Sequence, residues 1–238
     1  IRDEPHAPLS YVASRGHRCR HFPERELPIS TNTENAEPPA VPIRQRISDG
    51  ARSIVDPIIR GLVRKGVGPN AITIAGFLVV TASCGLILGE FWLLSWFVFT
   101  VGSLSDMLDG SVARLSGKAS TFGAFLDSTL DRLAEGLVLG SIGIVFARDQ
   151  RYFAVAACFV ALTASFLVSY TRARAEGLGI DSNKGGLMSR VERLFLIGTG
   201  LFFGWIDHFL EIAIYVLAVL TVLTVVQRVV HVSRALRT

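Results

Sequence analysis

The stretch from residue 106 to residue 131 constrains this chain most, because it places four aspartates between two long apolar runs. These aspartates are Asp106, Asp109, Asp127 and Asp131. At about 3.6 residues per turn, the first two share one face of a helix and the last two share a face of the next. The short connection between them makes the two helices antiparallel neighbours. We therefore expect the four carboxylates to converge on one spot.

Converging acidic side chains at a membrane edge are costly unless cations neutralise them. Carboxylate oxygens are hard ligands that suit Mg²⁺, Mn²⁺ or Ca²⁺ rather than softer metals. A single aspartate near a helix end is more often a solvated interfacial residue or the partner of an arginine. Four aspartates at matched spacing, with Gly110 and Ala113 on the same face, instead favour a metal site. Two such carboxylate pairs could bridge two cations that grip a diphosphate.

The rest of the chain predicts an all-α polytopic membrane protein. Half of the 238 residues are apolar, only 18% are charged, and the mean hydropathy is +0.45. Six apolar runs approach the ~20 residues needed to cross the hydrocarbon core. The predicted spans are residues 69–88, 91–114, 122–147, 152–172, 191–205 and 208–230.

The segment before the first span divides into two parts. Residues 1–45 are polar and rich in proline, without helical or strand periodicity, so we interpret them as a tail, a linker or the remnant of a soluble module. Residues 47–65 have one apolar helical face and one charged face, which predicts an amphipathic helix in the membrane interface. The predicted membrane domain therefore covers residues 46–238.

The distribution of basic residues predicts the orientation. Lysine and arginine concentrate at one set of span ends, whereas the opposite ends carry only Arg148 and Arg151 beside several acidic residues. By the positive-inside rule, both termini and the aspartate hairpin lie in the cytoplasm. Basic helix ends also account for the net charge of +4, so no nucleic-acid partner is predicted.

The full pattern resembles that of the CDP-alcohol phosphotransferases. It reads Asp106-x-x-Asp109-Gly110-x-x-Ala113-Arg114, eight residues, then Gly123-x-x-x-Asp127-x-x-x-Asp131. The resemblance covers roughly residues 46–238 and implies phosphoryl transfer from a CDP-linked donor to an alcohol, with release of CMP. It implies that the four aspartates bind metal and that Asp131 is the catalytic base. It further implies a CDP-lipid site at Asn70, Thr73, Gly110, Ala113 and Arg114.

The acceptor is predicted from a second resemblance, to actinobacterial phosphatidylinositol phosphate synthases. Ser128 and Arg132 follow the third and fourth aspartates, where members using glycerol 3-phosphate more often have proline and lysine. Basic residues at the cytoplasmic ends of the fourth and fifth spans could hold the phosphate of the acceptor. These are Arg172, Arg174, Lys184, Arg190 and Arg193. The alternative is that they anchor helix ends among anionic headgroups.

The expected function is transfer of the phosphatidyl group of CDP-diacylglycerol to inositol 1-phosphate at the cytoplasmic membrane. We expect two Mg²⁺ or Mn²⁺ ions per site, and the resemblance implies a homodimer. One alternative is phosphatidylglycerophosphate synthase or another CDP-alcohol phosphotransferase. A different class is a cation channel or transporter, because intramembrane acidic residues also mark ion paths.

Overall fold

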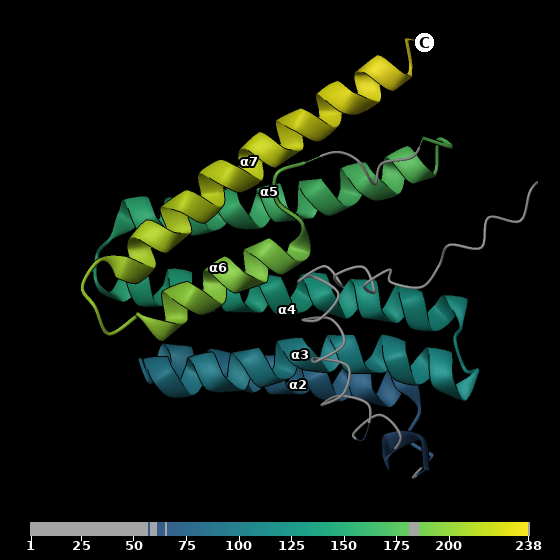
Figure 1. The fold of residues 1–238 in the computed structure, drawn as a ribbon. Helices are drawn as coiled ribbons and strands as arrows, with labels where there is room; N and C mark the ends of the chain where they lie inside the picture. Colours follow the sequence, from purple (N-terminus) through teal and green to yellow (C-terminus); the bar gives the residue numbers. More distant parts are fainter. Residues whose placement is uncertain (1–56, 58–60, 65, 181–185, 238) are drawn as a thin grey trace, which may run out of the picture. The chain divides into compact units, whose positions relative to one another are not determined.

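The computed structural model describes residues 57, 61–64, 66–180 and 186–237, apart from the side chains of Asp106 and Met107. Within these ranges all regular structure is helical. The helices, shown in Figure 1, are α2 (Pro69–Leu88), α3 (Trp92–Ser116), α4 (Thr121–Arg148), α5 (Tyr152–Glu176), α6 (Arg190–Phe202) and α7 (Phe209–Ala235). Residues 1–45, the predicted tail, lie outside the described part of the chain.

These six helices coincide with the six predicted runs to within a few residues. Three of them, α2, α5 and α7, are long and apolar enough to cross a membrane. Helices α3 and α4 are as long, with 25 and 28 residues, but both carry the charged residues of the aspartate hairpin. Helix α6 has only 13 residues. Most of the predicted interfacial helix is outside the described residues, although residues 61–64 are helical.

Helices α2 and α3 approach each other closely through two glycines. A Cβ atom on Gly76 would lie 2.9 Å from the Cβ of Ser105, and one on Gly102 would lie 2.9 Å from the backbone nitrogen of Val80. No larger residue fits at either position without moving a helix. This close contact places the start of α2 beside the aspartate face of α3.

The turn between α3 and α4 is short, as predicted, but the two helices do not pack closely on each other as expected; α2 packs on both of them instead. Helix α3 ends at Gly117, whose φ of +66° lies in the left-handed region that glycine adopts readily. Helix α4 begins after Ser120, whose hydroxyl accepts a hydrogen bond of 3.0 Å from the backbone N–H of Gly123. Both signals are local, so the short turn follows from the sequence, whereas the packing of α2 on both helices does not.

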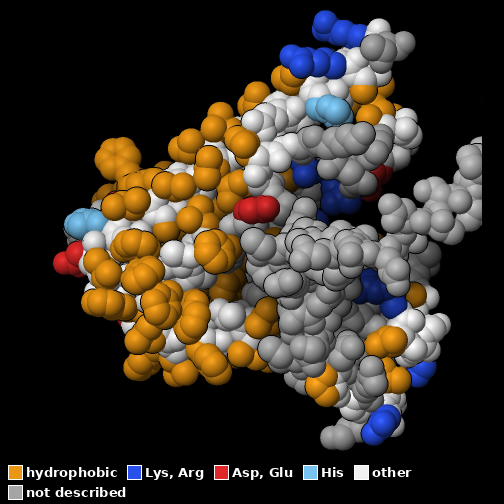
Figure 2. All heavy atoms as spheres, viewed as in Figure 1, with side chains coloured by type: hydrophobic (Ala, Val, Ile, Leu, Met, Phe, Trp, Pro, Cys, Tyr) orange, Lys and Arg blue, Asp and Glu red, His pale blue; other side chains and the backbone are white. Residues whose placement is uncertain are grey.

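The core lies where α4 meets the C-terminal helices. Val138, Leu139 and Ile142 of α4 are fully buried in one cluster with Ile214 and Leu217 of α7. Helix α5 packs on α4 and α7, and α6 packs on α7 and α3. Figure 2 shows hydrophobic side chains covering much of the visible surface away from the C-terminal end of α7, where lysine and arginine side chains gather. An apolar surface flanked by basic ends is typical of a membrane protein.

Candidate functional site

A cavity of about 260 Å³ lies beside the α3–α4 hairpin. All five residues predicted to bind the CDP-lipid line it, and so do Asp109 and Asp127. The full lining is Pro69, Asn70, Thr73, Asp109, Gly110, Ala113, Arg114, Lys118, Ala119, Ser120, Gly123, Ala124 and Asp127. The structure therefore brings two of the predicted metal ligands into one cavity with the predicted nucleotide residues.

Asp109 is buried in the wall of this cavity, with an exposed fraction of 6%. The hydroxyl of Thr73, on α2, donates a hydrogen bond of 2.6 Å to its Oδ2 atom. A buried carboxylate requires such compensation, because loss of hydration disfavours its charged form. Thr73 therefore fixes the orientation of Asp109 across the α2–α3 contact.

Gly123 of the aspartate pattern lies against α2. A Cβ atom at this position would be 2.9 Å from Oδ1 of Asn70. The glycine thus lets the first turn of α4 approach Asn70 closely and completes the cavity wall. Arg114, which also lines the cavity, is exposed and donates a hydrogen bond of 3.3 Å to the hydroxyl of Ser111. With Lys118, which the sequence analysis did not single out, it adds positive charge to the rim.

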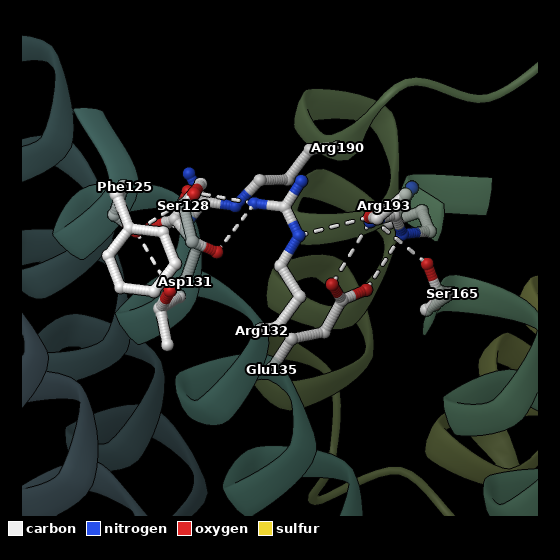
Figure 3. Close-up of polar contacts among 10 residues, drawn as sticks. Phe125, Ser128, Asp131, Arg132, Glu135, Ser165, Arg190 and Arg193 are labelled. Atoms are coloured by element: carbon white, nitrogen blue, oxygen red, sulfur yellow. Dashed lines mark hydrogen bonds and ion pairs between the residues drawn. The ribbon is translucent and has the colours of Figure 1, made fainter. Parts of the chain in front are cut away.

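Asp131 lies one turn after Asp127 on α4 and is 8% exposed. Its Oδ1 atom is 2.6 Å from Nη2 of Arg190, the first residue of α6, and its Oδ2 atom is 3.5 Å from Nη1 of Arg132. Figure 3 shows the side chains of Asp131, Arg132 and Arg190 grouped together. The candidate base therefore stands between two guanidinium groups, which sequence spacing alone did not predict.

Arg132 links this group to α5 as well. Its Nε donates to the hydroxyl of Ser169 at 3.0 Å, and its Nη1 donates to the backbone carbonyl of Ser128 at 3.0 Å. Arginine can make several such bonds at once because its donors have a fixed planar arrangement. Arg132 is thus a structural link between α4 and α5 at the level of Asp131.

One turn further into the core, Arg193 of α6 and Glu135 of α4 form a bidentate ion pair. The two N···O distances are 2.7 and 3.0 Å, and each side chain is 2% exposed. Arg193 was predicted to bind an acceptor phosphate, but in this structure it faces Glu135 in the protein interior. Glu135 shares the aspartate face of α4, and only the tertiary structure identifies its partner.

The other predicted acceptor residues lie at the end of α5 or beyond it. Arg172 pairs with Glu176 at 2.9 Å, and both side chains are about half exposed. Arg174 is exposed, and Lys184 lies outside the described residues. A residue absent from the prediction, Arg228 of α7, donates a hydrogen bond of 2.8 Å to the carbonyl of Val168 on α5. An arginine within the apolar run of the last helix was the signal that could have identified it.

The donor set fits a hard divalent cation. Asp109 and Asp127 present carboxylate oxygens to one cavity, and Asp106 occurs three residues before Asp109 on α3, so one helix face carries both. Among the side chains that the structure describes, no three His, Cys, Asp or Glu residues lie close enough to hold one ion. Asp131, which was expected to converge with Asp109 and Asp127, does not line this cavity, because its carboxylate faces Arg190 and Arg132. The side chain of Asp106 lies outside the described set.

A second hollow lies between α3 and α6. It has a volume of about 600 Å³ and an almost wholly apolar lining that includes Trp96, Phe99, Leu194 and Phe195. Arg190, the partner of Asp131, also lines it. An apolar groove bordered by the arginine that contacts the candidate base is suited to a substrate with a hydrocarbon chain.

Comparisons with known proteins show which enzymes this chain resembles. Phosphatidylinositol phosphate synthase of Corynebacterium glutamicum is 36% identical over 193 residues, which cover 78% of this chain and 86% of the relative. Archaetidylinositol phosphate synthase of Methanothermobacter thermautotrophicus is 37% identical over 189 residues, covering 78% of this chain and 92% of the relative.

Solved structures of the Mycobacterium tuberculosis phosphatidylinositol phosphate synthase are also similar. The structure with CDP-DAG bound gives a TM-score of 0.71 at 34% identity and covers 76% of this chain and 94% of that one. The complex with manganese and citrate gives 0.69 at 34% identity, covering 75% and 88%. The family model for CDP-alcohol phosphatidyltransferase matches residues 67–231. This chain therefore belongs to the CDP-alcohol phosphatidyltransferase family.

Proposed function

We propose that this enzyme transfers the phosphatidyl group of CDP-diacylglycerol to inositol 1-phosphate. A hydroxyl oxygen of inositol forms a bond to the β-phosphorus, the bond from that phosphorus to the bridging oxygen breaks, and CMP leaves. The observation that carries the proposal is the cavity in which Asp109 and Asp127 meet all five predicted nucleotide residues. The resemblance to phosphatidylinositol phosphate synthases supports the acceptor.

In this proposal the cavity beside the hairpin holds the cytidine diphosphate. Gly110 and Ala113 leave space against α3, and Asn70 on α2 offers polar contacts to the nucleotide. Arg114 and Lys118 contribute positive charge to the rim, which favours a diphosphate.

Four carboxylates are proposed to hold two divalent cations, Mg²⁺ or Mn²⁺. They are Asp106, Asp109, Asp127 and Asp131. When bound, such cations would neutralise the diphosphate and stabilise the charge on the departing CMP. The hydrogen bond from Thr73 orients one of these carboxylates before any ligand arrives.

Asp131 is the proposed general base, which removes the proton from the attacking hydroxyl. Its contact with Arg190 orients the carboxylate, and Arg190 also borders the apolar groove. A phosphorylated acceptor bound near Arg190, Arg172 and Arg174 would place its hydroxyl beside this base.

The groove between α3 and α6 would take an acyl chain of the donor. Its polar end at Arg190 lies where the diacylglycerol phosphate must meet the base.

We propose six membrane spans and an active site on the cytoplasmic side, because basic residues gather at the hairpin end. We also propose a homodimer, as the family resemblance implies.

An acceptor competition tests the proposal. Purified protein in nanodiscs containing CDP-diacylglycerol would receive Mg²⁺ and inositol 1-phosphate, free inositol or glycerol 3-phosphate, and CMP release would be measured. We expect release with inositol 1-phosphate only. Release only with glycerol 3-phosphate would agree with the proposed donor site but show that the acceptor assignment is wrong. Cation flux through liposomes that lack CDP-lipid would favour the transporter alternative.

A second arm tests the base. Asp131→Asn should reduce turnover about 100-fold or more while CDP-diacylglycerol still binds, because a general base contributes catalysis rather than donor affinity. Asp149→Asn, at the opposite end of α4, is the matched control and should leave turnover unchanged. Turnover of Asp131→Asn equal to that of the control would remove Asp131 from this role.

A further inference from the structure

Two ion pairs join α4 to α6, and they are in register with each other. Asp131 and Glu135 are four residues apart on α4, so they share a face. Arg190 and Arg193 are three residues apart on α6 and face them in the same order. Figure 3 shows the two carboxylates and the two guanidinium groups in this arrangement. The inner pair is buried, and the outer pair contains the candidate base.

We propose that Glu135 is a positioning residue. By holding Arg193, it fixes the first turn of α6 so that Arg190 reaches Asp131. The inference rests on the proposed function, because it assigns Arg190 and Asp131 to the acceptor side of the reaction. It goes beyond that function by explaining what places Arg190 there.

The energetics of burial favour positioning over simple stabilisation. A buried ion pair adds little net stability compared with apolar residues of similar volume, because both charges lose hydration. Its value lies in geometry, since a bidentate contact permits only one relative orientation of the two groups. With both side chains 2% exposed, neither Glu135 nor Arg193 can exchange its partner for water without moving a helix.

The start of α6 is attached to α7 by separate contacts. The backbone N–H of Leu187 donates to Oε1 of Gln227 at 2.9 Å, and that of Met188 donates to the hydroxyl of Thr224 at 3.1 Å. These bonds fasten the residues just before α6 to α7, and the capping box between Ser189 and Glu192 then begins the helix. The Glu135–Arg193 pair adds an attachment to α4, the helix that carries the base. A 13-residue helix held at both places has its first turn oriented toward Asp131.

The test uses the full chain in nanodiscs, with whichever acceptor supports CMP release from the wild type. Glu135→Gln keeps the side-chain shape and removes the charge that holds Arg193. We expect the acceptor KM to rise at least about 10-fold, because Arg190 no longer reaches Asp131. The donor KM should rise less than the acceptor KM, because the cavity proposed for the cytidine diphosphate has no residue of α6 in its lining and only the acyl-chain groove borders α6. An unchanged acceptor KM would overturn the proposal. A lowered one would also overturn it, since it would mean that a released Arg193 binds the acceptor directly.

The matched control is Glu211→Gln on α7. Glu211 is also paired with an arginine, Arg151 at 3.2 Å, but at the opposite end of the bundle. The acceptor KM of this variant should equal that of the wild type, whether or not its thermal stability falls as far as that of Glu135→Gln. A rise equal to that of Glu135→Gln would reduce the effect to general destabilisation and overturn the proposal.

A double-mutant cycle shows whether Glu135 acts through Arg190. In an Arg190→Lys background, Glu135→Gln should change the acceptor KM by less than about twofold, because the group it positions has already been altered. A full, independent effect of both substitutions would contradict the inference. If Glu135→Gln does not fold, the double variant Glu135→Leu/Arg193→Met replaces it, because apolar residues of similar volume can substitute for a buried ion pair. An acceptor KM equal to that of the wild type in this double variant would also contradict the positioning role of Glu135.

A structural readout keeps the inference separate from the proposed reaction. Spin labels at Leu133→Cys on α4 and Phe195→Cys on α6, both exposed positions, report the spacing of the two helices after the native cysteines are replaced by serine. Glu135→Gln should broaden this distance distribution, whereas Glu211→Gln should not. Equal distributions would refute the positioning role, and a wild type inactive with every acceptor would refute only the proposed function.

Discussion

The two ends of the helical bundle carry similar residue types in different surroundings. At the hairpin end, Asp109 and Asp131 are buried, with exposed fractions of 6% and 8%. At the opposite end, Glu90, Asp149 and Asp207 lie exposed at the connections between helices. Exposed carboxylates keep their hydration, whereas buried ones require specific compensation. Burial therefore distinguishes Asp109 and Asp131 from the acidic residues at the opposite connections.

The opposite end also contains a paired cluster around Glu211, whose side chain is 16% exposed. It accepts hydrogen bonds from Tyr215 at 2.7 Å and from Arg151 at 3.2 Å, and Nδ1 of His208 lies 3.0 Å away. All of these partners come from the connections to α5 and α7 or from α7 itself. At the hairpin end, by contrast, α2, α4 and α6 each contribute a partner. Convergence of several helices on buried acids distinguishes the candidate site.

The strongest way to test this contrast is to neutralise one acid at each end. Asp109→Asn should reduce kcat about 1,000-fold, because a ligand that helps stabilise transition-state charge contributes several kcal/mol. Asp149→Asn should change kcat less than about twofold, as surface substitutions usually do. CMP release from CDP-diacylglycerol measures both. Comparable losses in the two variants would show that burial does not identify the functional acids.

A smaller effect is expected from the hydroxyl that orients Asp109. Thr73→Val should lower kcat/KM about 10-fold, because a hydrogen bond to a buried charge contributes about 1.5 kcal/mol. The control is Thr81→Val on the same helix, where the hydroxyl donates only to the carbonyl of Phe77 at 2.8 Å. Steady-state kinetics of both variants would decide the point. An equal loss of kcat/KM in Thr81→Val would mean that the effect comes from altered packing of α2.

The smallest effect concerns the close approach of α4 to α2. Gly123→Ala should raise the donor KM about fivefold, because the added methyl group would displace Asn70 at a cost of about 1 kcal/mol. Gly140→Ala is the control, since a Cβ atom there would meet nothing within 4 Å. Donor titrations at saturating acceptor would compare the two. A donor KM unaffected in Gly123→Ala would exclude Asn70 from the donor site.

Local patterns in the sequence predicted most of the helices and part of the site. Pro69 and Gly89 mark the ends of α2, so its predicted bounds were correct. The spacing of the four aspartates correctly placed Asp109 on the face of α3 that carries Gly110 and Ala113, and these three residues line one cavity. Such features depend on neighbours within about four residues, which helical geometry alone specifies.

The partners of the charged residues could not be predicted in the same way. Arg190 and Arg193 have similar sequence surroundings, yet one contacts Asp131 beside the groove and the other is sealed against Glu135. The difference depends on how far α6 rotates against α4, which is set by contacts between helices distant in sequence.

The sequence by itself thus determined the helical class, the short turn between α3 and α4 and the helix faces that carry the aspartates, because these follow from periodicity and local turns. Only the tertiary structure decided which acids are buried, which arginines face them and where Asn70 meets Gly123. The physical reason is that a helix face is a local property, whereas the partner it meets depends on the packing of the whole bundle.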